Sequence, residues 1–218
     1  MDWKPLIWTE GIVGCGKTTF SNRVGELLNL EVIEEPVDTN FYLEPFYKDQ
    51  KKYAFGMQIL LLHRRYAMQV HAAIEAGATG KKNGAILDRS IAGDCVFALL
   101  HLQSGNIDEL DWRCYQECYD TMCRSLLPPT LLIYLDAQPE TAFQRMKARN
   151  RKAESEVPIE YLIALREGYK NLLHEAETGL TPWAHAVRVV RIPWDVDTLT
   201  DEQWMKTADT IKDACRMR

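Results

Sequence analysis

Residues 11–18 of this 218-residue chain read Gly-Ile-Val-Gly-Cys-Gly-Lys-Thr and fit the phosphate-loop pattern GxxxxGK[ST]. The three glycines let the backbone wrap around an anion, so that the loop's amide groups point at phosphate oxygens. We expect Lys17 to contact the terminal phosphates and the hydroxyl of Thr18 to hold Mg²⁺. The motif therefore predicts a site for a nucleoside triphosphate.

The segments on either side of this loop alternate between strand and helix patterns. Strands are expected at residues 5–10, 31–35, 84–87, 131–135 and 187–192. Helices are expected at residues 17–28, 51–76, 110–125, 140–149 and 159–177. This order predicts an α/β fold in which one five-stranded parallel sheet carries helices on both faces. Functional residues of such a sheet gather at the carboxyl ends of its strands.

The composition fits a folded globular protein with a single domain over residues 1–218. Hydrophobic residues make up 46% of the chain and charged residues 26%. The 26 basic and 31 acidic residues give a net charge of −5, which disfavours binding to a nucleic-acid polymer. No stretch approaches the roughly 18 apolar residues that span a membrane, and the N-terminus has no leader pattern. We therefore expect a cytoplasmic protein whose six cysteines are free thiols.

Charged side chains follow two of the predicted strands. Glu34 and Glu35 close the second strand, where a carboxylate can accept a proton from an attacking hydroxyl. A solvated strand end is the alternative. Asp88 and Arg89 follow the third strand. Asp88 offers the oxygen ligand that Mg²⁺ prefers, and Arg89 could orient a substrate hydroxyl. The alternative for these two residues is an internal salt bridge that caps the next helix.

A basic stretch without acidic residues follows the fourth strand. Its cationic side chains are Arg145, Lys147, Arg149, Arg151 and Lys152. In small kinases this position is a lid that closes over the phosphoryl group, and arginines there stabilise the developing charge. We predict a lid at about residues 145–158, with a solvated helix face as the alternative.

The phosphate loop alone does not distinguish a kinase from a GTPase or another ATPase. The chain lacks the Asn-Lys-x-Asp tetrapeptide with which GTPases read guanine. Residues 131–136 imitate the apolar, Asp-terminated strand of motor ATPases. A small kinase is the simplest interpretation at this length.

Several further motifs appear in a specific order. They are Glu-Pro-Val at 35–37, Tyr-Lys-Asp-Gln-Lys-Lys-Tyr at 47–53 leading to Gln58, Asp-Arg-Ser at 88–90, Arg-Asn-Arg at 149–151 and Val-Pro-Ile-Glu-Tyr-Leu at 157–162. Together with the phosphate loop they resemble the deoxynucleoside kinase family, which includes deoxyadenosine, deoxyguanosine and deoxycytidine kinases. The resemblance implies a P-loop kinase fold with a lid, ATP and Mg²⁺ as donor and cofactor, and phosphorylation of a deoxynucleoside 5′-hydroxyl in dNTP salvage. It also implies a homodimer, for which helices 51–76 and 110–125 could supply the interface.

The resemblance also implies individual roles. Glu35 matches the general base, and Arg89 matches the arginine that positions this base and the phosphate, with Lys17 as a third catalytic residue. Asp88 takes the place of an acidic residue associated with Mg²⁺, beside Thr18. The other substrate contacts would be Gln58 at the base edge and Tyr47 and Glu154 at the 3′-hydroxyl. The implied ATP contacts are Gly11, Gly14, Cys15, Gly16, Lys17, Thr18, Thr19, Arg145, Arg149 and Arg151.

Two further positions bear on the choice of base. Arg65 lies seven residues after Gln58, and Asp94 lies six after Asp88. Deoxycytidine and deoxyguanosine kinases resemble this arrangement, with an Arg–Asp pair at the base. An Asp held by an Arg accepts a hydrogen bond from an exocyclic amine or a ring N–H, whereas the 5-methyl group and O4 of thymine would leave its charge unpaired. The pair therefore favours a purine or cytosine deoxynucleoside over thymidine, with an interhelical salt bridge as the alternative.

Two other functions remain open. A nucleoside monophosphate kinase would need cationic groups for the substrate phosphate, but residues 31–47 contain neither Lys nor Arg. A non-catalytic nucleotide-binding subunit would not need Lys17, Thr18, Glu35 and Arg89 together.

Overall fold

The computed structural model describes residues 4–35, 40–77, 81–151, 157–183, 187–196 and 198–216. Its five strands form one sheet in the order β2-β3-β1-β4-β5, and every pairing is parallel. The strands are Leu6–Glu10 (β1), Glu31–Ile33 (β2), Ala85–Asp88 (β3), Leu131–Asp136 (β4) and Val189–Pro193 (β5). The predicted α/β fold with a five-stranded parallel sheet is confirmed.

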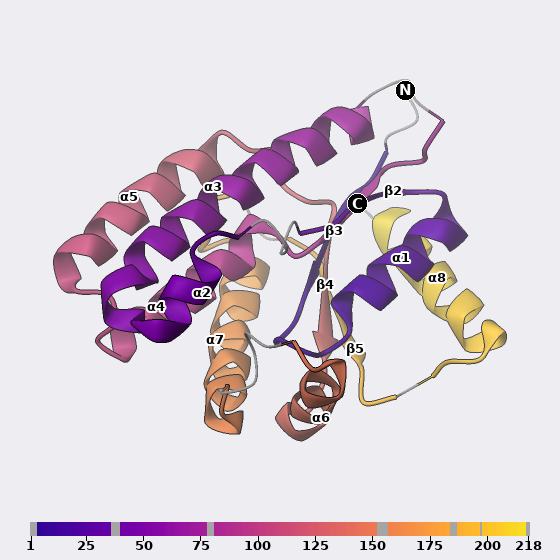
Figure 1. The fold of residues 1–218 in the computed structure, drawn as a ribbon. Coiled ribbons are helices and arrows are strands. Elements are labelled where there is room, and N and C mark those ends of the chain that lie inside the picture. The colour runs from indigo at the N-terminus through magenta and orange to yellow at the C-terminus, as the bar shows by residue number, and fades with distance from the viewer. Residues whose placement is uncertain are drawn as a thin grey trace.

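Helices cover both faces of the sheet (Figure 1). One face carries Lys17–Leu28 (α1) and Asp201–Arg216 (α8), which pack against each other. The other face carries Gln50–Gly77 (α3), Ile91–Gln103 (α4), Glu109–Arg124 (α5) and Ile159–Thr178 (α7). The short helix Leu43–Lys48 (α2) packs on α3, and Pro139–Arg149 (α6) packs beside α7 near the carboxyl ends of the strands.

Three of these helices were not among the segments that the sequence predicted. Helix α2 has only six residues, too few to establish a helical period. Helix α4 is buried on most sides, so its sequence shows no polar face. Helix α8 does carry a readable signal, because its buried residues Ala208, Ile211 and Ala214 recur at helical spacing.

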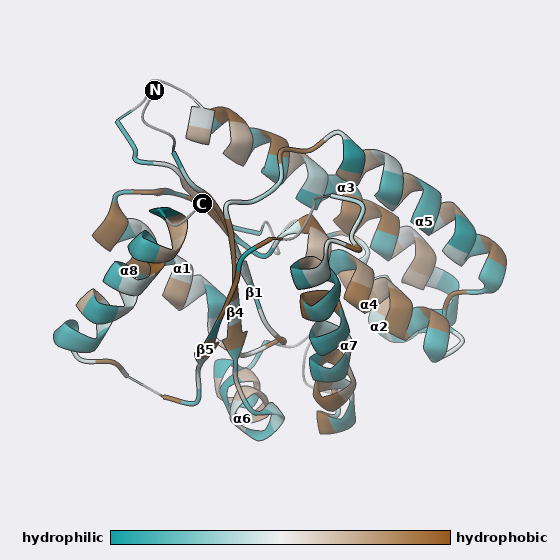
Figure 2. Cartoon of the chain, turned by 180° about the vertical axis from the view of Figure 1, so that it is seen from behind, coloured by the Kyte–Doolittle hydropathy of each residue, from teal (hydrophilic) through white to brown (hydrophobic). Residues whose placement is uncertain are grey.

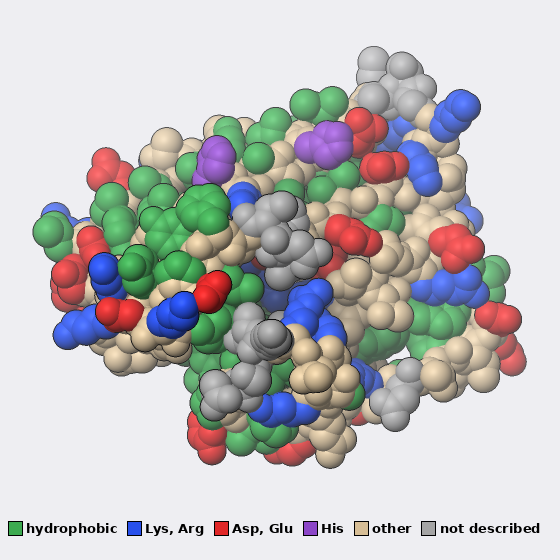
Figure 3. Space-filling view, in the orientation of Figure 1, with side chains coloured by type: hydrophobic (Ala, Val, Ile, Leu, Met, Phe, Trp, Pro, Cys, Tyr) green, Lys and Arg blue, Asp and Glu red, His purple; other side chains and the backbone are tan. Residues whose placement is uncertain are grey.

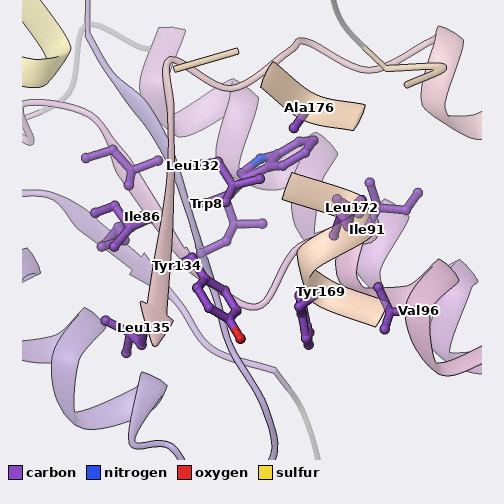
Figure 4. Close-up of a cluster of buried hydrophobic side chains, with 14 of the residues drawn as sticks. Trp8, Ile86, Ile91, Val96, Leu132, Tyr134, Leu135, Tyr169, Leu172 and Ala176 are labelled. Atoms are coloured by element: carbon purple, nitrogen blue, oxygen red, sulfur yellow. The ribbon is translucent and has the colours of Figure 1, made fainter. Parts of the chain in front are cut away.

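The core lies between the central strands and the helices that cover them. All five residues of β1 are buried, and the ring of Trp8 contacts that of Trp183 edge-on at 4.9 Å between centroids. Tyr169 of α7 lies beside Tyr134 of β4, with 5.5 Å between ring centroids, and Val96 of α4 packs against α7 (Figure 4). Hydrophobic residues accordingly lie along the strands, and hydrophilic residues lie on the outer faces of the helices (Figure 2). Within the described ranges, no helix has both the length and the apolar character needed to cross a membrane.

Candidate active site

The loop between β1 and α1 has the geometry of an anion site. Gly14 and Gly16 adopt left-handed backbone conformations, with φ of 80° and 101°, and Gly16 precedes the first turn of α1. A Cβ at Gly14 would lie 2.3 Å from the carbonyl oxygen of Ala142, so only glycine lets α6 pack against the loop. The backbone amides at the start of α1 carry partial positive charge. They therefore make the loop a favourable place for a negatively charged group.

Lys17 lies inside this loop. Its ammonium group donates hydrogen bonds to the carbonyl oxygens of Gly11 and Ile12, both at 3.0 Å. Burial lowers the pKa of Lys17, and the neighbouring Arg89 lowers it further. A phosphate in the loop would offer this desolvated ammonium an anionic partner.

Thr18 and Asp88 bring two oxygen ligands together where α1 begins and β3 ends. The hydroxyl of Thr18 donates to Oδ2 of Asp88 at 2.5 Å. A hydroxyl beside a buried carboxylate fits a hard cation such as Mg²⁺. Among the residues that the structure describes, no three His, Cys, Asp or Glu side chains gather around a common point for a metal ion. A cation here would therefore depend on further ligands from phosphate and water.

Glu35 lies between two arginines at the end of β2. Arg65 Nη2 donates to Oε1 of Glu35 at 2.6 Å, and Arg89 Nε lies 3.3 Å from Oε2. Burial raises the pKa of Glu35, but the two arginines outweigh this effect and lower the pKa to about 2. The neighbouring Glu34 is exposed and accepts a hydrogen bond from Asn22 at 2.8 Å. Of the two predicted carboxylates, only Glu35 faces the arginines.

Arg89 is held in an uncommon backbone conformation, with φ of 79°. Its amide donates to the carbonyl oxygen of Thr9 at 3.0 Å, and its Nη1 donates to the hydroxyl of Tyr169 at 2.7 Å. The hydroxyl of Tyr169 in turn donates to Oε2 of Glu10 at 2.8 Å. Burial opposes the charged form of Arg89, but Tyr169, Glu35 and Glu10 outweigh it and raise the pKa of Arg89. These contacts fix a permanent cation beside Glu35.

Arg65 also joins the end of β2 to α4. Its Nη1 forms an ion pair with Oδ1 of Asp94, and both side chains are almost fully buried. The ring of Phe97 lies beneath both guanidinium groups, with centroid distances of 5.8 Å to Arg65 and 4.7 Å to Arg89. Gln58 is buried two helical turns before Arg65, on the same face of α3. The structure thus brings Gln58, Arg65 and Asp94 to one side of Glu35.

Arg145 connects the loop to the segment after β5. Its Nη1 donates to the carbonyl oxygens of Cys15 at 3.0 Å and Trp194 at 2.9 Å, and its Nη2 donates to that of Val196 at 2.6 Å. The side chain of Thr19 lines a small cavity with Trp194 and Val196, directly beside the loop. Arg145 therefore holds two segments that border the start of α1.

Of the four remaining predicted residues, the structure describes Arg149, Arg151 and Tyr47. Arg149 and Arg151 are exposed at the end of α6, and Tyr47 is half-buried on α2. Glu154 and part of the predicted lid lie outside the described residues. Basic side chains gather near the middle of the face that carries α2, as Figure 3 shows. The charge distribution of this face suits an anionic ligand.

Sequence patterns do not indicate four residues of this network, namely Glu10, Phe97, Tyr169 and Tyr115. The hydroxyl of Tyr115 donates to Oδ2 of Asp94 at 2.7 Å. Glu10 carried a usable signal, because it is an acidic residue that ends an apolar strand directly before the glycine loop. The other three lie on buried helix faces, where an aromatic residue reads as ordinary core.

Comparisons with known proteins identify the family and the fold. A family model described as deoxynucleoside kinase matches residues 7–215. The deoxyadenosine kinase of Dictyostelium discoideum is 36% identical over 185 residues, covering 85% of this chain and 70% of that protein. The deoxyguanosine kinase of the same organism is 34% identical over 177 residues, covering 81% of this chain and 61% of that protein. The solved structure of deoxyadenosine kinase from M. mycoides with bound dCTP has a TM-score of 0.77 at 25% identity, covering 96% of this chain and 99% of that one.

Proposed function

The chain belongs to the deoxynucleoside kinase family, and from this premise we propose that it transfers the γ-phosphoryl group of ATP to the 5′-hydroxyl of a deoxynucleoside. The product is a 5′-monophosphate that enters dNTP salvage. The observation that carries the proposal is the position of Glu35, held between Arg65 and Arg89.

Glu35 acts as the general base. With a pKa of about 2 it is a carboxylate at neutral pH, ready to accept the proton of the 5′-hydroxyl. The hydroxyl oxygen attacks the γ-phosphorus, the bond between that phosphorus and the β–γ bridging oxygen breaks, and ADP leaves. Because an alcohol is a far weaker acid than Glu35, the proton moves as the new P–O bond forms.

Cationic groups stabilise the charge that spreads over the phosphoryl oxygens. Lys17 contributes from the loop and Arg89 from the end of β3, while Arg149 and Arg151 contribute from the lid. Thr18 and Asp88 would hold Mg²⁺, since their oxygens lie side by side. Bound Mg²⁺ supplies charge neutralisation at the phosphate oxygens.

The loop supplies the phosphate contacts for the donor, for which we propose ATP. The amides of Gly11, Gly14, Cys15 and Gly16 bind its phosphates, and Arg145 keeps the loop next to Trp194. The cavity that Thr19 lines beside Trp194 and Trp204 suits a flat nucleotide base.

The deoxynucleoside lies on the other side of Glu35. Gln58 binds the base edge, since an amide offers both a donor and an acceptor. Tyr47 and Glu154 bind the 3′-hydroxyl. Asp94, paired with Arg65, accepts a hydrogen bond from the base, which favours a purine or cytosine deoxynucleoside over thymidine.

We further propose that the chain forms one domain and works as a homodimer. Helices α3 and α5 lie side by side on one flank (Figure 1). Apolar side chains on these helices are exposed, including Ile74 at 60% and Leu110 at 74%. A second copy of the chain, related by a two-fold axis, would bury these apolar side chains. The cytoplasmic location stays a prediction of the sequence.

The test of the reaction is the variant Glu35→Gln, with Glu34→Gln as its matched control. We expect Glu35→Gln to bind the deoxynucleoside but to lower kcat by at least ~10²-fold, because the general base is lost. Glu34→Gln removes a neighbouring carboxylate that is exposed and bonded to Asn22, so its kcat should stay near wild type. Full activity of Glu35→Gln would exclude Glu35 as the base.

A further inference from the structure

We propose that Tyr115, a buried residue of α5 outside the reacting centre, is a positioning residue that sets base selectivity by fixing the carboxylate of Asp94. This inference rests on the proposed function and deepens it. It concerns a residue that contacts neither Glu35 nor the loop in any hydrogen bond or ion pair that the structure records.

The geometry of Asp94 is determined from two sides. The hydroxyl of Tyr115 donates to Oδ2 of Asp94 at 2.7 Å, and Arg65 forms its ion pair with the other oxygen, Oδ1. Both Asp94 and Tyr115 have no exposed surface. One donor from α3 and one from α5 therefore fix the rotation of the buried Asp94 carboxylate, which belongs to a third helix, α4.

Tyr115 is suited to this task because it stays a neutral donor. Burial raises the pKa of Tyr115 well above its ordinary value, so its phenol keeps its proton. Its ring is fixed as well, since it stacks on Trp112 at 5.5 Å and on Tyr119 at 6.1 Å between centroids. A phenylalanine would keep the ring and its stacking and would remove only the hydrogen bond.

The consequence extends to the choice of substrate. Without Tyr115, one oxygen of a fully buried carboxylate loses its donor, and the group gains freedom to turn. A base that donates a hydrogen bond to Asp94 depends on that orientation, whereas the 5-methyl group and O4 of thymine offer Asp94 no donor. Loss of the Tyr115 hydroxyl should therefore reduce the difference in kcat/KM between the favoured deoxynucleosides and thymidine.

The chain offers a closely matched control at Tyr119. It lies one turn further along α5, is also buried, and its hydroxyl accepts a hydrogen bond from Nε1 of Trp183 at 3.1 Å. Tyr119→Phe thus removes a comparable buried hydroxyl without touching Asp94. A purely structural role would make the two variants behave alike.

The experiment compares Tyr115→Phe, Tyr119→Phe and wild type. It measures kcat and KM for the four natural deoxynucleosides and the dissociation constant of each by calorimetry. We expect Tyr115→Phe to lower kcat/KM for the favoured deoxynucleoside by ~10-fold and to change that for thymidine by less than ~3-fold. Tyr119→Phe should leave unchanged the ratio of kcat/KM for the favoured deoxynucleoside to kcat/KM for thymidine. In an Asp94→Asn background, Tyr115→Phe should have little further effect on the ratio.

Each outcome is decisive. If Tyr115→Phe and Tyr119→Phe change the ratio equally, or if Tyr115→Phe weakens all four substrates alike, the inference is overturned while the kinase function stands. If wild type phosphorylates none of the four, the proposed function fails and this inference fails with it. Should Tyr115→Phe not fold, 3-fluorotyrosine at position 115 keeps the ring and strengthens the donor. It must then widen the ratio, and an unchanged ratio would overturn the proposal.

Discussion

Glu35 shows how a single residue is prepared by its neighbours. Burial alone would favour the protonated acid, yet Arg65 and Arg89 lower its pKa to about 2. The same two arginines have further partners, since Arg65 also binds Asp94 and Arg89 also binds Tyr169. Glu35 is therefore kept ionised by two arginines that are themselves held in place by other side chains.

This ionisation makes a prediction for stability. The folded pKa of Glu35 lies below its ordinary value of 4.5, so its contribution is complete above that value and is lost as the pH falls toward about 2. A shift of this size corresponds to about 3 kcal/mol. Glu35→Gln should therefore be less stable than wild type at pH 7, and the gap should shrink at pH 3. Urea unfolding of both proteins at pH 7 and pH 3 checks this. An equal difference in the free energy of unfolding at the two pH values would contradict a stabilising role for the ion pairs of Glu35.

At the scale of elements, the position of α4 decides where Arg89 and Asp94 lie. Its first turn packs closely on the end of β1, where the carboxylate of Glu10 accepts hydrogen bonds from the amide and hydroxyl of Ser90, both at 2.7 Å. Gly93 lies against the same carboxylate, and a Cβ there would be 2.5 Å from Oε2 of Glu10. The absence of a side chain at Gly93 is thus a condition for the site.

Gly93→Ala should therefore destabilise the fold and impair activity. We expect a loss of about 1–3 kcal/mol in the free energy of unfolding, as for other overpacked cores. Gly77→Ala is the control, because a Cβ at this end of α3 would meet no heavy atom within 4 Å among the described residues beyond its chain neighbours and its own helix backbone. That substitution should leave stability unchanged or raise it by up to about 1 kcal/mol. Thermal unfolding of both variants distinguishes them, and equal melting temperatures would contradict the close packing.

The elements also show what sequence patterns can and cannot reveal. The loop, its helix at 17–28 and the five strands were predictable, because glycine spacing and apolar periodicity are local signals. Candidate residues at strand ends were predictable for the same reason, since topology places them together. Tyr115 and Tyr169 were not, because their partners Asp94, Arg89 and Glu10 are distant in sequence.

At the scale of the whole molecule, the flank formed by α3 and α5 predicts self-association. Val70 and Ile74 lie one turn apart on α3 and are 37% and 60% exposed. Replacing both with Lys should convert the proposed homodimer to a monomer, because two charges would be buried at the interface. Light scattering after size exclusion measures this. A wild type that is already monomeric would contradict the proposed interface.

The whole molecule should phosphorylate deoxynucleosides selectively, and the wild-type protein shows this without any substitution. Wild-type protein is given ATP and Mg²⁺ with each of the four natural deoxynucleosides, and kcat/KM is compared. We predict that a purine deoxynucleoside or deoxycytidine is phosphorylated at least ~10-fold better than thymidine, because Asp94 and Arg65 meet thymine poorly. Preferred turnover of thymidine would contradict the role of this pair, and folded protein that phosphorylates none of the four would contradict the kinase function itself.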